Sequence, residues 1–324
     1  MMKSGMTTPG TKKAGRTMGR RRGTPIHGWM IIDKPDGMTS AAVVNRVRKL
    51  TNAAKVGHGG TLDPMATGVL PIALGEATKT VAYVMDGRKS YRFRVRWGQA
   101  TETDDAEGAV TDTSDSRPDR PAIEDVLAQF RGPIEQIPPA YSAVKVEGRR
   151  AYDLARQDQD VKLEPRTVEI HRIELAEMVD ADHADFLVES GKGAYMRGLA
   201  RDIARALGTH GHIAALRRTS VGPFAEADAI SLDRLEELGH SAPSSDYVLP
   251  VETALVGIPA LALTEAEARR LRSGQPLPVL PVASRNPKGS IRQGAIVCAM
   301  DGPKLAALAR IEGGEIRPVR VMNL

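Results

Sequence analysis

Cysteine is almost missing from this sequence, which has a single one, Cys298, in 324 residues. One cysteine excludes an intrachain disulfide and a cysteine-rich zinc site, so we expect Cys298 to be a small apolar core residue. Aromatic residues make up only 4% of the chain, and we therefore expect a core built mainly from Ala, Leu, Val and Ile. The sequence also lacks a signal peptide and an apolar run of about 18 residues, which predicts a soluble, cytoplasmic protein without membrane association.

Acidic residues are missing from the first 32 positions, which carry seven basic ones: Lys3, Lys12, Lys13, Arg16, Arg20, Arg21 and Arg22. The rest of the chain has 38 basic and 40 acidic residues, so the net charge of +5 comes from this end of the chain. We interpret residues 1–25 as a flexible basic arm, suited to loose phosphate contacts that weaken with salt. The alternative is a solvated tail without a binding role.

The length and the 41% apolar content are enough for about two domains with a substantial core. A Gly-, Ser- and Pro-rich stretch at 239–247 predicts a boundary between a first domain over 26–250 and a small β-rich module over 255–324. Helix and strand patterns alternate without a regular strand–helix–strand rhythm. This favours an α+β fold on a largely antiparallel mixed sheet that is flanked by helices.

Several patterns predict helices, and the clearest strand pattern of the sequence lies within 90–97. The helices are expected after a cap at Thr39 or Ser40, over 76–84, and from a cap at Thr264 to Arg272. Within 90–97, four apolar residues alternate with three arginines: Tyr91, Phe93, Val95 and Trp97 against Arg92, Arg94 and Arg96. Such alternation predicts a strand with one apolar face. We expect the arginine face to be a solvated sheet surface unless a nucleic acid lies nearby.

Residues 57–68, here called the glycine loop, concentrate four glycines around one carboxylate, Asp63, which Pro64 follows directly. Glycine permits sharp turns and close backbone approach, while proline favours an extended conformation at Asp63. Taken alone, Asp-Pro beside glycines is also ordinary turn chemistry. No Lys-Ser/Thr pair follows the glycines, and no G-x-G-x-x-G pattern follows a strand, which excludes the common phosphate and dinucleotide loops.

Several separated blocks, in this order, resemble one family closely: the bacterial tRNA pseudouridine-55 synthases, the TruB family. The blocks are Ile32–Pro35 with Gly37–Ser40, the glycine loop continuing through Leu74–Lys79, Tyr91, Ile137–Pro139 with Tyr141–Ala143, Gly191–Arg197, and Leu216–Thr219. Two positions depart from the family pattern. Gly59 and Ala194 each stand where the family commonly has a threonine, which removes a hydroxyl but leaves His58, Asp63 and Tyr195 in place.

The resemblance implies a pseudouridine synthase fold, followed by a PUA-like RNA-binding module over 255–324. It also implies isomerisation of uridine-55 in the T-loop of tRNA to pseudouridine, without a metal or organic cofactor. The T-arm of tRNA would be the partner, and we expect a monomer.

The resemblance also assigns roles to residues. Asp63 would be the catalytic nucleophile, Tyr91 would stack on the target base, and Arg197 would pair with the aspartate. His58 would support the opened T-loop, Tyr195 and Leu216 would line the uracil pocket, and Lys34 would pack against the glycine loop. Without the resemblance, we would interpret Tyr91 as a core residue and Arg197 as a surface ion-pair partner. His58 alone does not indicate a metal site.

The residue types agree with this chemistry. The isomerisation consumes no water, so one carboxylate can suffice where hydrolytic glycosidases use two. A neighbouring guanidinium favours the ionised form of that carboxylate, and a tyrosine face can receive a base that has left its stack. The alternative hypothesis is a catalytically silent RNA-binding or tRNA-folding protein on the same fold, which would bind RNA without turnover.

Overall fold

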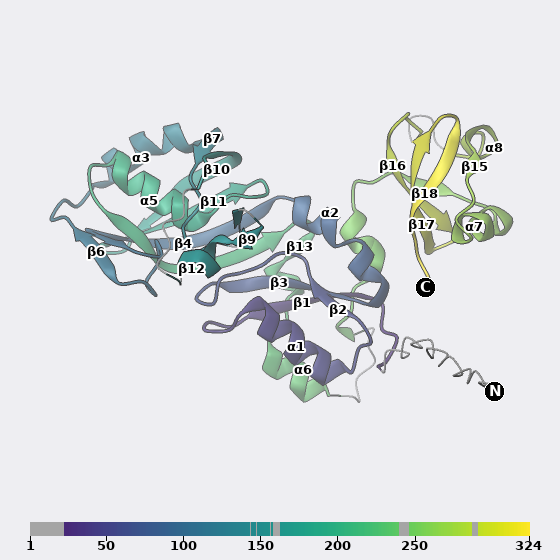
Figure 1. Cartoon of the computed structure of the whole chain (residues 1–324), viewed down its shortest axis with the longest axis horizontal. Coiled ribbons are helices and arrows are strands. Elements are labelled where there is room, and N and C mark those ends of the chain that lie inside the picture. The colour runs from purple at the N-terminus through teal and green to yellow at the C-terminus, as the bar shows by residue number, and fades with distance from the viewer. Residues whose placement is uncertain are drawn as a thin grey trace, which may run out of the picture.

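The computed structural model describes residues 23–142, 144–146, 148–155, 157, 163–239, 246–286 and 291–324. These residues form an elongated body around one large sheet, with a smaller β-rich module at one end (Figure 1). The basic arm predicted for 1–25 lies almost entirely outside the described residues, as does most of the boundary segment predicted at 239–247.

The large sheet has nine strands and is antiparallel except at one pair of neighbours. Its main path is β1 (Gly28–Lys34), β3 (Thr67–Leu74), β12 (Gly211–Val221), β4 (Lys89–Trp97), β11 (His183–Ser190), β10 (Arg166–Met178) and β7 (Gly132–Gln136), with β2 (Val56–His58) on β3 and β13 (Phe224–Ala225) on β12. The α+β prediction with a largely antiparallel sheet is confirmed.

The exception in the sheet is a short parallel seam between β3 and β12. It consists of two pairs, Thr67 with Arg217 and Gly68 with Arg218. Because the glycine loop runs directly into β3, this seam brings the loop beside the middle of β12. Two segments that are far apart in the chain thus meet. One hydrogen bond between them runs from the hydroxyl of Thr67 to Leu216 O, 149 residues later.

Helices cover this sheet and fill its core. They are α1 (Ser40–Thr51), α2 (Val81–Asp86), α3 (Arg120–Val126), α5 (Met196–Ala206) and α6 (Leu232–Leu238). Thr39 caps α1, as predicted, by accepting a hydrogen bond from the backbone of Ala42 at 3.1 Å. Val43, Val44 and Val47 bury the apolar face of this helix.

The helix predicted over 76–84 is wrong as one element. A 3₁₀ turn over Gly75–Lys79 comes first, and α2 begins only at Val81. The break lies at Thr80, whose backbone N–H (2.9 Å) and hydroxyl (2.8 Å) both donate to Ala77 O. Such bonds tighten a turn and end it.

Strand β4 has the predicted apolar face. Phe93 stacks on Phe186 of β11 with ring centroids 5.4 Å apart, and Trp97 meets the same ring edge-on at 6.1 Å. Most other buried core residues are aliphatic, as the low aromatic content predicts.

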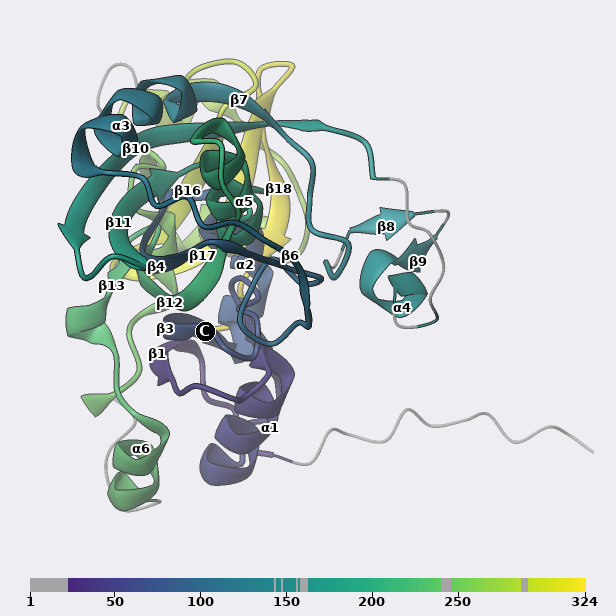
Figure 2. The same cartoon turned by 90° about the vertical axis from the view of Figure 1, so that its left-hand side faces the viewer.

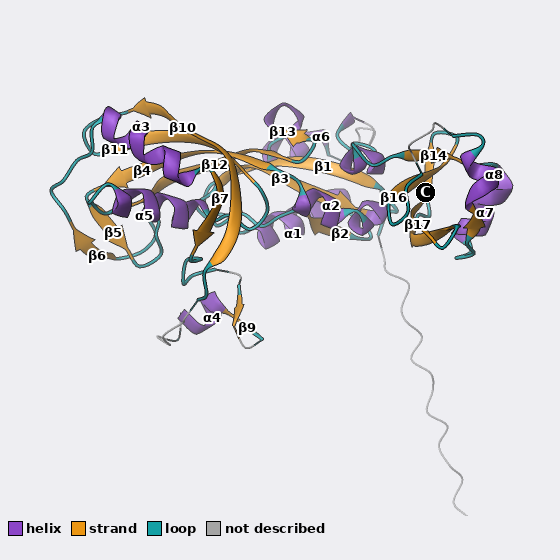
Figure 3. Ribbon diagram, turned by 90° about the horizontal axis from the view of Figure 1, so that it is seen from above, coloured by secondary structure: helices purple, strands orange, loops and turns teal. Residues whose placement is uncertain are grey.

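Two smaller sheets extend from this body. Strand β5 (Gln99–Thr101) pairs with β6 (Val110–Thr113), and β8 (Lys145–Val146) pairs with β9 (Arg149–Arg150), which leads into α4 (Ala151–Ala155). The β8–β9–α4 unit projects away from the large sheet in two perpendicular views (Figures 2 and 3).

The C-terminal module is the β-rich unit that the sequence predicts, and its sheet is consistent with a PUA-like module. Its sheet runs β14 (Ala260–Ala262), β16 (Ile296–Asp301), β17 (Lys304–Glu312), β18 (Glu315–Val321) and β15 (Leu277–Pro278), with helices α7 (Glu265–Arg272) and α8 (Val279–Ala283). Thr264 caps α7 as predicted, in a reciprocal pair of hydrogen bonds with Glu267.

The module shares a hydrophobic cluster with the large sheet. Trp29 and Phe224 on the sheet side pack into the same cluster as Cys298 and Leu308 of the module. Cys298 is 5% exposed, and its burial raises the pKa of its thiol to about 11. The prediction of a small core residue is confirmed. In the described part of the chain, no helix is long and apolar enough to cross a membrane.

Candidate active site

The glycine loop needs glycine where its backbone turns or passes close to other atoms. Gly68 has φ +97°, and a Cβ there would lie 2.3 Å from Arg218 O. At Gly59 a Cβ would lie 2.9 Å from Cγ1 of Val84 in α2. The missing threonine at position 59 therefore has a packing reason, because Val84 occupies the space beside it.

Two buried side chains hold the loop on either side of Asp63. The ammonium of Lys34, which is fully buried, donates to Pro64 O at 2.8 Å. The hydroxyl of Ser40 accepts from the backbone N–H of Leu62 at 2.8 Å and donates to Leu62 O at 3.0 Å. The residues before and after the aspartate are thus fixed to the first motif of the chain.

Arg218 holds the loop from β12. Its guanidinium donates to Gly60 O at 3.0 Å, to Thr61 O at 3.3 Å and to Val69 O at 2.9 Å. Register pairs Arg218 with Tyr91 across the strands, so the phenol lies beside this guanidinium. Burial is the main cause that lowers the pKa of Arg218 from its ordinary value.

Asp63 itself is bound by Arg197, the second residue of α5. Nε of Arg197 donates to Oδ2 of Asp63 at 2.9 Å, and the Asp63 side chain remains 35% exposed. The other guanidinium nitrogens donate to Thr103 O at 2.8 Å and Tyr141 O at 2.9 Å, while Asp105 Oδ2 lies 3.4 Å from Nη1. Arg197 is only 4% exposed, so it acts as a rigid support that holds one carboxylate oxygen and leaves the side chain open on its other side.

A cavity of about 530 Å³ opens in front of Asp63. Its wall includes these residues: Gly60, Thr61, Leu62, Asp63, Met85, Asp86, Lys89, Tyr91, Ser142, Gly191, Lys192, Gly193, Ala194, Tyr195, Met196, Leu216 and Arg218. Four of the predicted site residues, Asp63, Tyr91, Tyr195 and Leu216, therefore line one cavity. The remaining three lie behind or beside it.

Those three residues have different surroundings. Arg197 and Lys34 lie behind the loop, in the contacts already described. His58 is placed at the start of the loop, where its Nδ1 accepts a long hydrogen bond of 3.4 Å from Gly60 N–H. Burial, followed by the charge of Arg218, lowers the pKa of His58 and so favours the neutral imidazole.

Tyr195 is fixed through its backbone. Its N–H donates to Oε1 of Gln136 at 2.8 Å, and its carbonyl accepts from Nε2 of the same side chain at 3.0 Å. Burial raises the pKa of the Tyr195 phenol, which stays protonated in the cavity wall at neutral pH.

The sequence reasoning did not assign roles to Lys89, Arg218 or Asp86. The strand predicted over 90–97 begins one residue after Lys89, whereas the observed strand includes it and places it on the same face as Tyr91. Arg218 belongs to the last motif block, without a role of its own. Asp86 is a second carboxylate in the cavity wall, but it is 61% exposed and paired with Lys192 at 2.8 Å.

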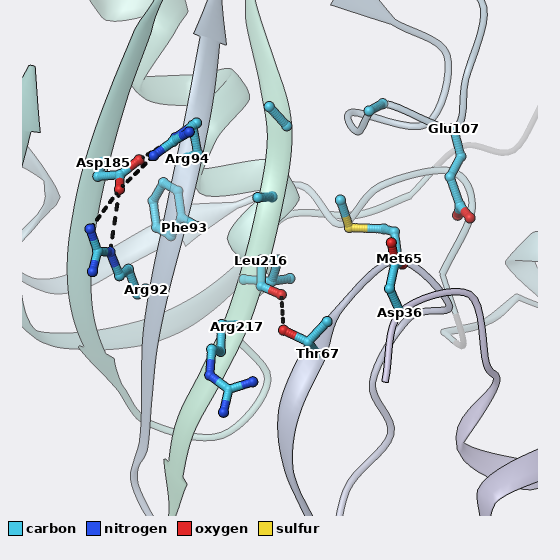
Figure 4. Close-up of a pocket in the computed structure, with 13 residues that line it drawn as sticks. Asp36, Met65, Thr67, Arg92, Phe93, Arg94, Glu107, Asp185, Leu216 and Arg217 are labelled. Atoms are coloured by element: carbon cyan, nitrogen blue, oxygen red, sulfur yellow. Dashed lines mark hydrogen bonds and ion pairs between the residues drawn. The ribbon is translucent and has the colours of Figure 1, made fainter. Parts of the chain in front are cut away.

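A neighbouring pocket of about 580 Å³ contains the arginine side of β4 (Figure 4). Arg92 and Arg94 both bond to Asp185, at 2.9 Å and 2.6 Å, and Arg217 pairs with Asp33 at 3.0 Å. Asp185 is almost fully buried, while Arg92 and Arg94 are 51% and 39% exposed. Arg92 and Arg94 thus lie on a solvated sheet surface and share one buried carboxylate.

Sequence models of one family match most of the chain. The model described as TruB family pseudouridylate synthase (N terminal domain) matches residues 48–196, and that described as tRNA pseudouridylate synthase B C-terminal domain matches residues 197–256. The protein named tRNA pseudouridine synthase B of Rhodospirillum rubrum is 61% identical over 305 residues, which are 94% of this chain and 99% of that protein. The chain belongs to the TruB family.

Other known proteins agree with this membership. The Gluconacetobacter diazotrophicus protein of the same name is 56% identical, over 94% of this chain and all of that protein. Among solved structures, a chain of the crystal structure of a Cbf5-Nop10-Gar1 complex is similar, with TM-score 0.70 and 28% identity, over 92% of this chain and 84% of that one. The expected pseudouridine synthase fold is confirmed.

Proposed function

We propose that this protein is a tRNA pseudouridine synthase that isomerises uridine-55 in the T-loop, with Asp63 as its catalytic nucleophile or base. The observation that carries the proposal is the ion pair of Asp63 with buried Arg197 at the wall of a cavity that Tyr91 and Tyr195 also line. The relatives named tRNA pseudouridine synthase B support tRNA as the substrate, and the motif blocks support the T-loop position.

The geometry suits a reaction at one flipped nucleotide. A base inside a stacked loop cannot reach a carboxylate at a cavity wall, so the target uridine leaves its stack and enters the cavity. Tyr91 offers its ring face to the uracil, while Leu216 and Tyr195 limit the width of the site. His58, at the edge of the glycine loop, is positioned to support the opened RNA loop.

The arrangement around Asp63 holds the carboxylate in one orientation. Arg197 binds only Oδ2, and among the described residues Oδ1 accepts no hydrogen bond, so one oxygen remains for the substrate. Lys34 and Ser40 hold the neighbouring carbonyls, which limits the rotation of the loop about Asp63. Such preorganisation lets a single carboxylate act without reorganisation during the reaction.

Incubation of the full chain with unmodified tRNA, followed by chemical mapping of pseudouridine, tests this proposal. We expect one modified position, uridine-55, and no product from a tRNA that carries cytidine there. Product at another uridine with position 55 untouched would contradict the site assignment. Tight tRNA binding without any pseudouridine would instead support the alternative of a silent RNA-binding or tRNA-folding protein.

A further inference from the structure

Two buried cations border the cavity without a carboxylate beside them. Lys89, at the start of β4, is 8% exposed, and Arg218 of β12 is 2% exposed. Among the described residues, no carboxylate oxygen lies within 4.0 Å of the charged nitrogens of either side chain. Burying a charge without a partner costs several kcal/mol, so their place at the cavity wall calls for a reason.

The three N–H groups of Arg218 named above are held by loop carbonyls, whereas the ammonium of Lys89 is held on one side only. Its Nζ donates to Met85 O and, at 2.6 Å, to Gly87 O, at the end of α2. An uncharged amine would retain two N–H donors, enough for both carbonyls. The carbonyls at the end of α2 thus occupy two of the three donors of the ammonium and attract its charge. The third N–H has no partner among the described residues and is available at the cavity wall.

The reaction of a uridine supplies a negative charge for this cation to meet. When the bond between N1 and C1′ breaks, both electrons stay with the uracil, whose charge is shared by N1, O2 and O4. When C5 then bonds to C1′ with an electron pair of the uracil ring, the proton on C5 is lost to water and N1 takes a proton from water, so that the product ring is neutral. The negative charge exists only between these two events, and fixed positive charge near the ring lowers the barrier to reach it.

We propose that Lys89 is a further catalytic residue, whose ammonium stabilises the negative charge that develops on the uracil ring as its bond to ribose breaks. The inference rests on the proposed function, because only a reacting uridine places that charge in the cavity. Lys89 and Tyr91 point to the same face of β4, two residues apart, and both line the cavity in which the base would stack.

The charged groups around Lys89 come from three other elements. Asp86 of α2 favours the ammonium, whereas Arg218 of β12 and Lys192 after β11 disfavour it. Burial is the largest effect, and the pKa of Lys89 falls to about 8. The ammonium predominates at pH 7 and is lost as the pH rises through about 8. Turnover that depends on the ammonium must fall over the same interval.

Single-turnover conversion of saturating unmodified tRNA, measured from about pH 6.5 to about pH 9.5, tests the assignment. Wild type, Lys89→Met and Lys89→Arg are compared, with Lys49→Met on the exposed face of α1 as the matched loss of one lysine. We expect a wild-type rate that falls above about pH 8, a Lys89→Met rate about 100-fold lower at pH 7 with tRNA affinity retained, and a Lys89→Arg rate without the alkaline fall.

Different failures have different meanings. An active wild type with no alkaline fall, or a Lys89→Met variant with the wild-type rate, would overturn the role of Lys89 and leave the proposed function intact. Weaker tRNA binding with an unchanged rate would also overturn it, because Lys89 would then bind a ground-state phosphate. A wild type that forms no pseudouridine would overturn both proposals. The pH profile of the wild type needs no substitution, so it tests the role of Lys89 even where a variant does not fold.

Discussion

The two faces of strand β4 carry positive charge in opposite ways. On the cavity face, Lys89 is buried and lies beside no carboxylate within ion-pair distance among the described residues. On the opposite face, Arg92 and Arg94 are largely exposed, yet both bind the buried carboxylate of Asp185. The two arginines thus share one buried carboxylate, whereas the single cation on the cavity face has none within ion-pair distance in the described part of the chain and is left for a substrate.

This difference shows why a count of basic residues is a poor guide to function. Exposed ion pairs on a sheet surface contribute little to stability and offer little net charge to a ligand. A buried guanidinium such as Arg197 has a larger effect, because removing it leaves the buried carboxylate of Asp105 without a positive partner and two backbone carbonyls without donors. Substitutions on the two faces should therefore have very different effects.

Replacing Arg197 by Met should have the largest effect on stability. The change leaves Asp105 as a nearly fully buried carboxylate without this partner and two backbone carbonyls without donors, so we expect the free energy of unfolding to fall by about 3–5 kcal/mol. Turnover should fall with it because Asp63 loses its support. Urea unfolding and single-turnover assays measure the two effects. Arg205→Met, exposed on the same helix, is the control, and equal stability of the two variants would contradict the role given to Arg197.

Restoring threonine at position 59 should have an intermediate effect. Gly59→Thr brings Cβ against Val84 Cγ1, and overpacking of this kind costs about 1–3 kcal/mol. Val84→Ala removes the opposing atom. We therefore expect the double variant to lose less stability than the sum of the losses in the two single variants. A double-mutant cycle by thermal unfolding measures this coupling. Strictly additive losses would show that Val84 is not the reason for glycine at this position.

Single substitutions on the exposed face should have the smallest effect. Arg92→Gln or Arg94→Gln leaves Asp185 with one guanidinium, and we expect each to change the free energy of unfolding by less than about 1 kcal/mol without changing turnover. The double substitution should cost more than the sum, because the buried carboxylate then loses both partners. A large loss of turnover from either single variant would mean that this face takes part in the reaction.

Patterns among neighbouring residues predict much of this fold. The cap at Thr39, the capping box at Thr264 and the alternation in 90–97 depend on neighbouring residues, and the structure has all three. The helix predicted over 76–84 failed because apolar spacing does not show that Thr80 closes a 3₁₀ turn on Ala77. The burial of Cys298 was predicted, but not that its cluster includes Trp29 from the other end of the chain.

The site depends on contacts that spacing alone cannot predict. Asp63 and Arg197 are 134 residues apart, and only the family resemblance suggested that they meet. The same holds for Lys34 with Pro64, beside the pairing of β1 with β3, and for Arg218 with Gly60, beside the seam between β3 and β12. Lys89 was not predicted, because the alternation of apolar residues and arginines that indicated a strand over 90–97 begins after it, and the structure extends the strand by that one residue.

The central claim is that the carboxylate of Asp63 performs the chemistry while its surroundings only hold it. Single-turnover conversion of unmodified tRNA by Asp63→Asn, with tRNA affinity measured in parallel, tests this most directly. Asparagine keeps the size of the side chain and one oxygen for Arg197, so we expect binding to persist while the rate falls by at least about 10⁴-fold. Pseudouridine formation at the wild-type rate by Asp63→Asn would contradict the account.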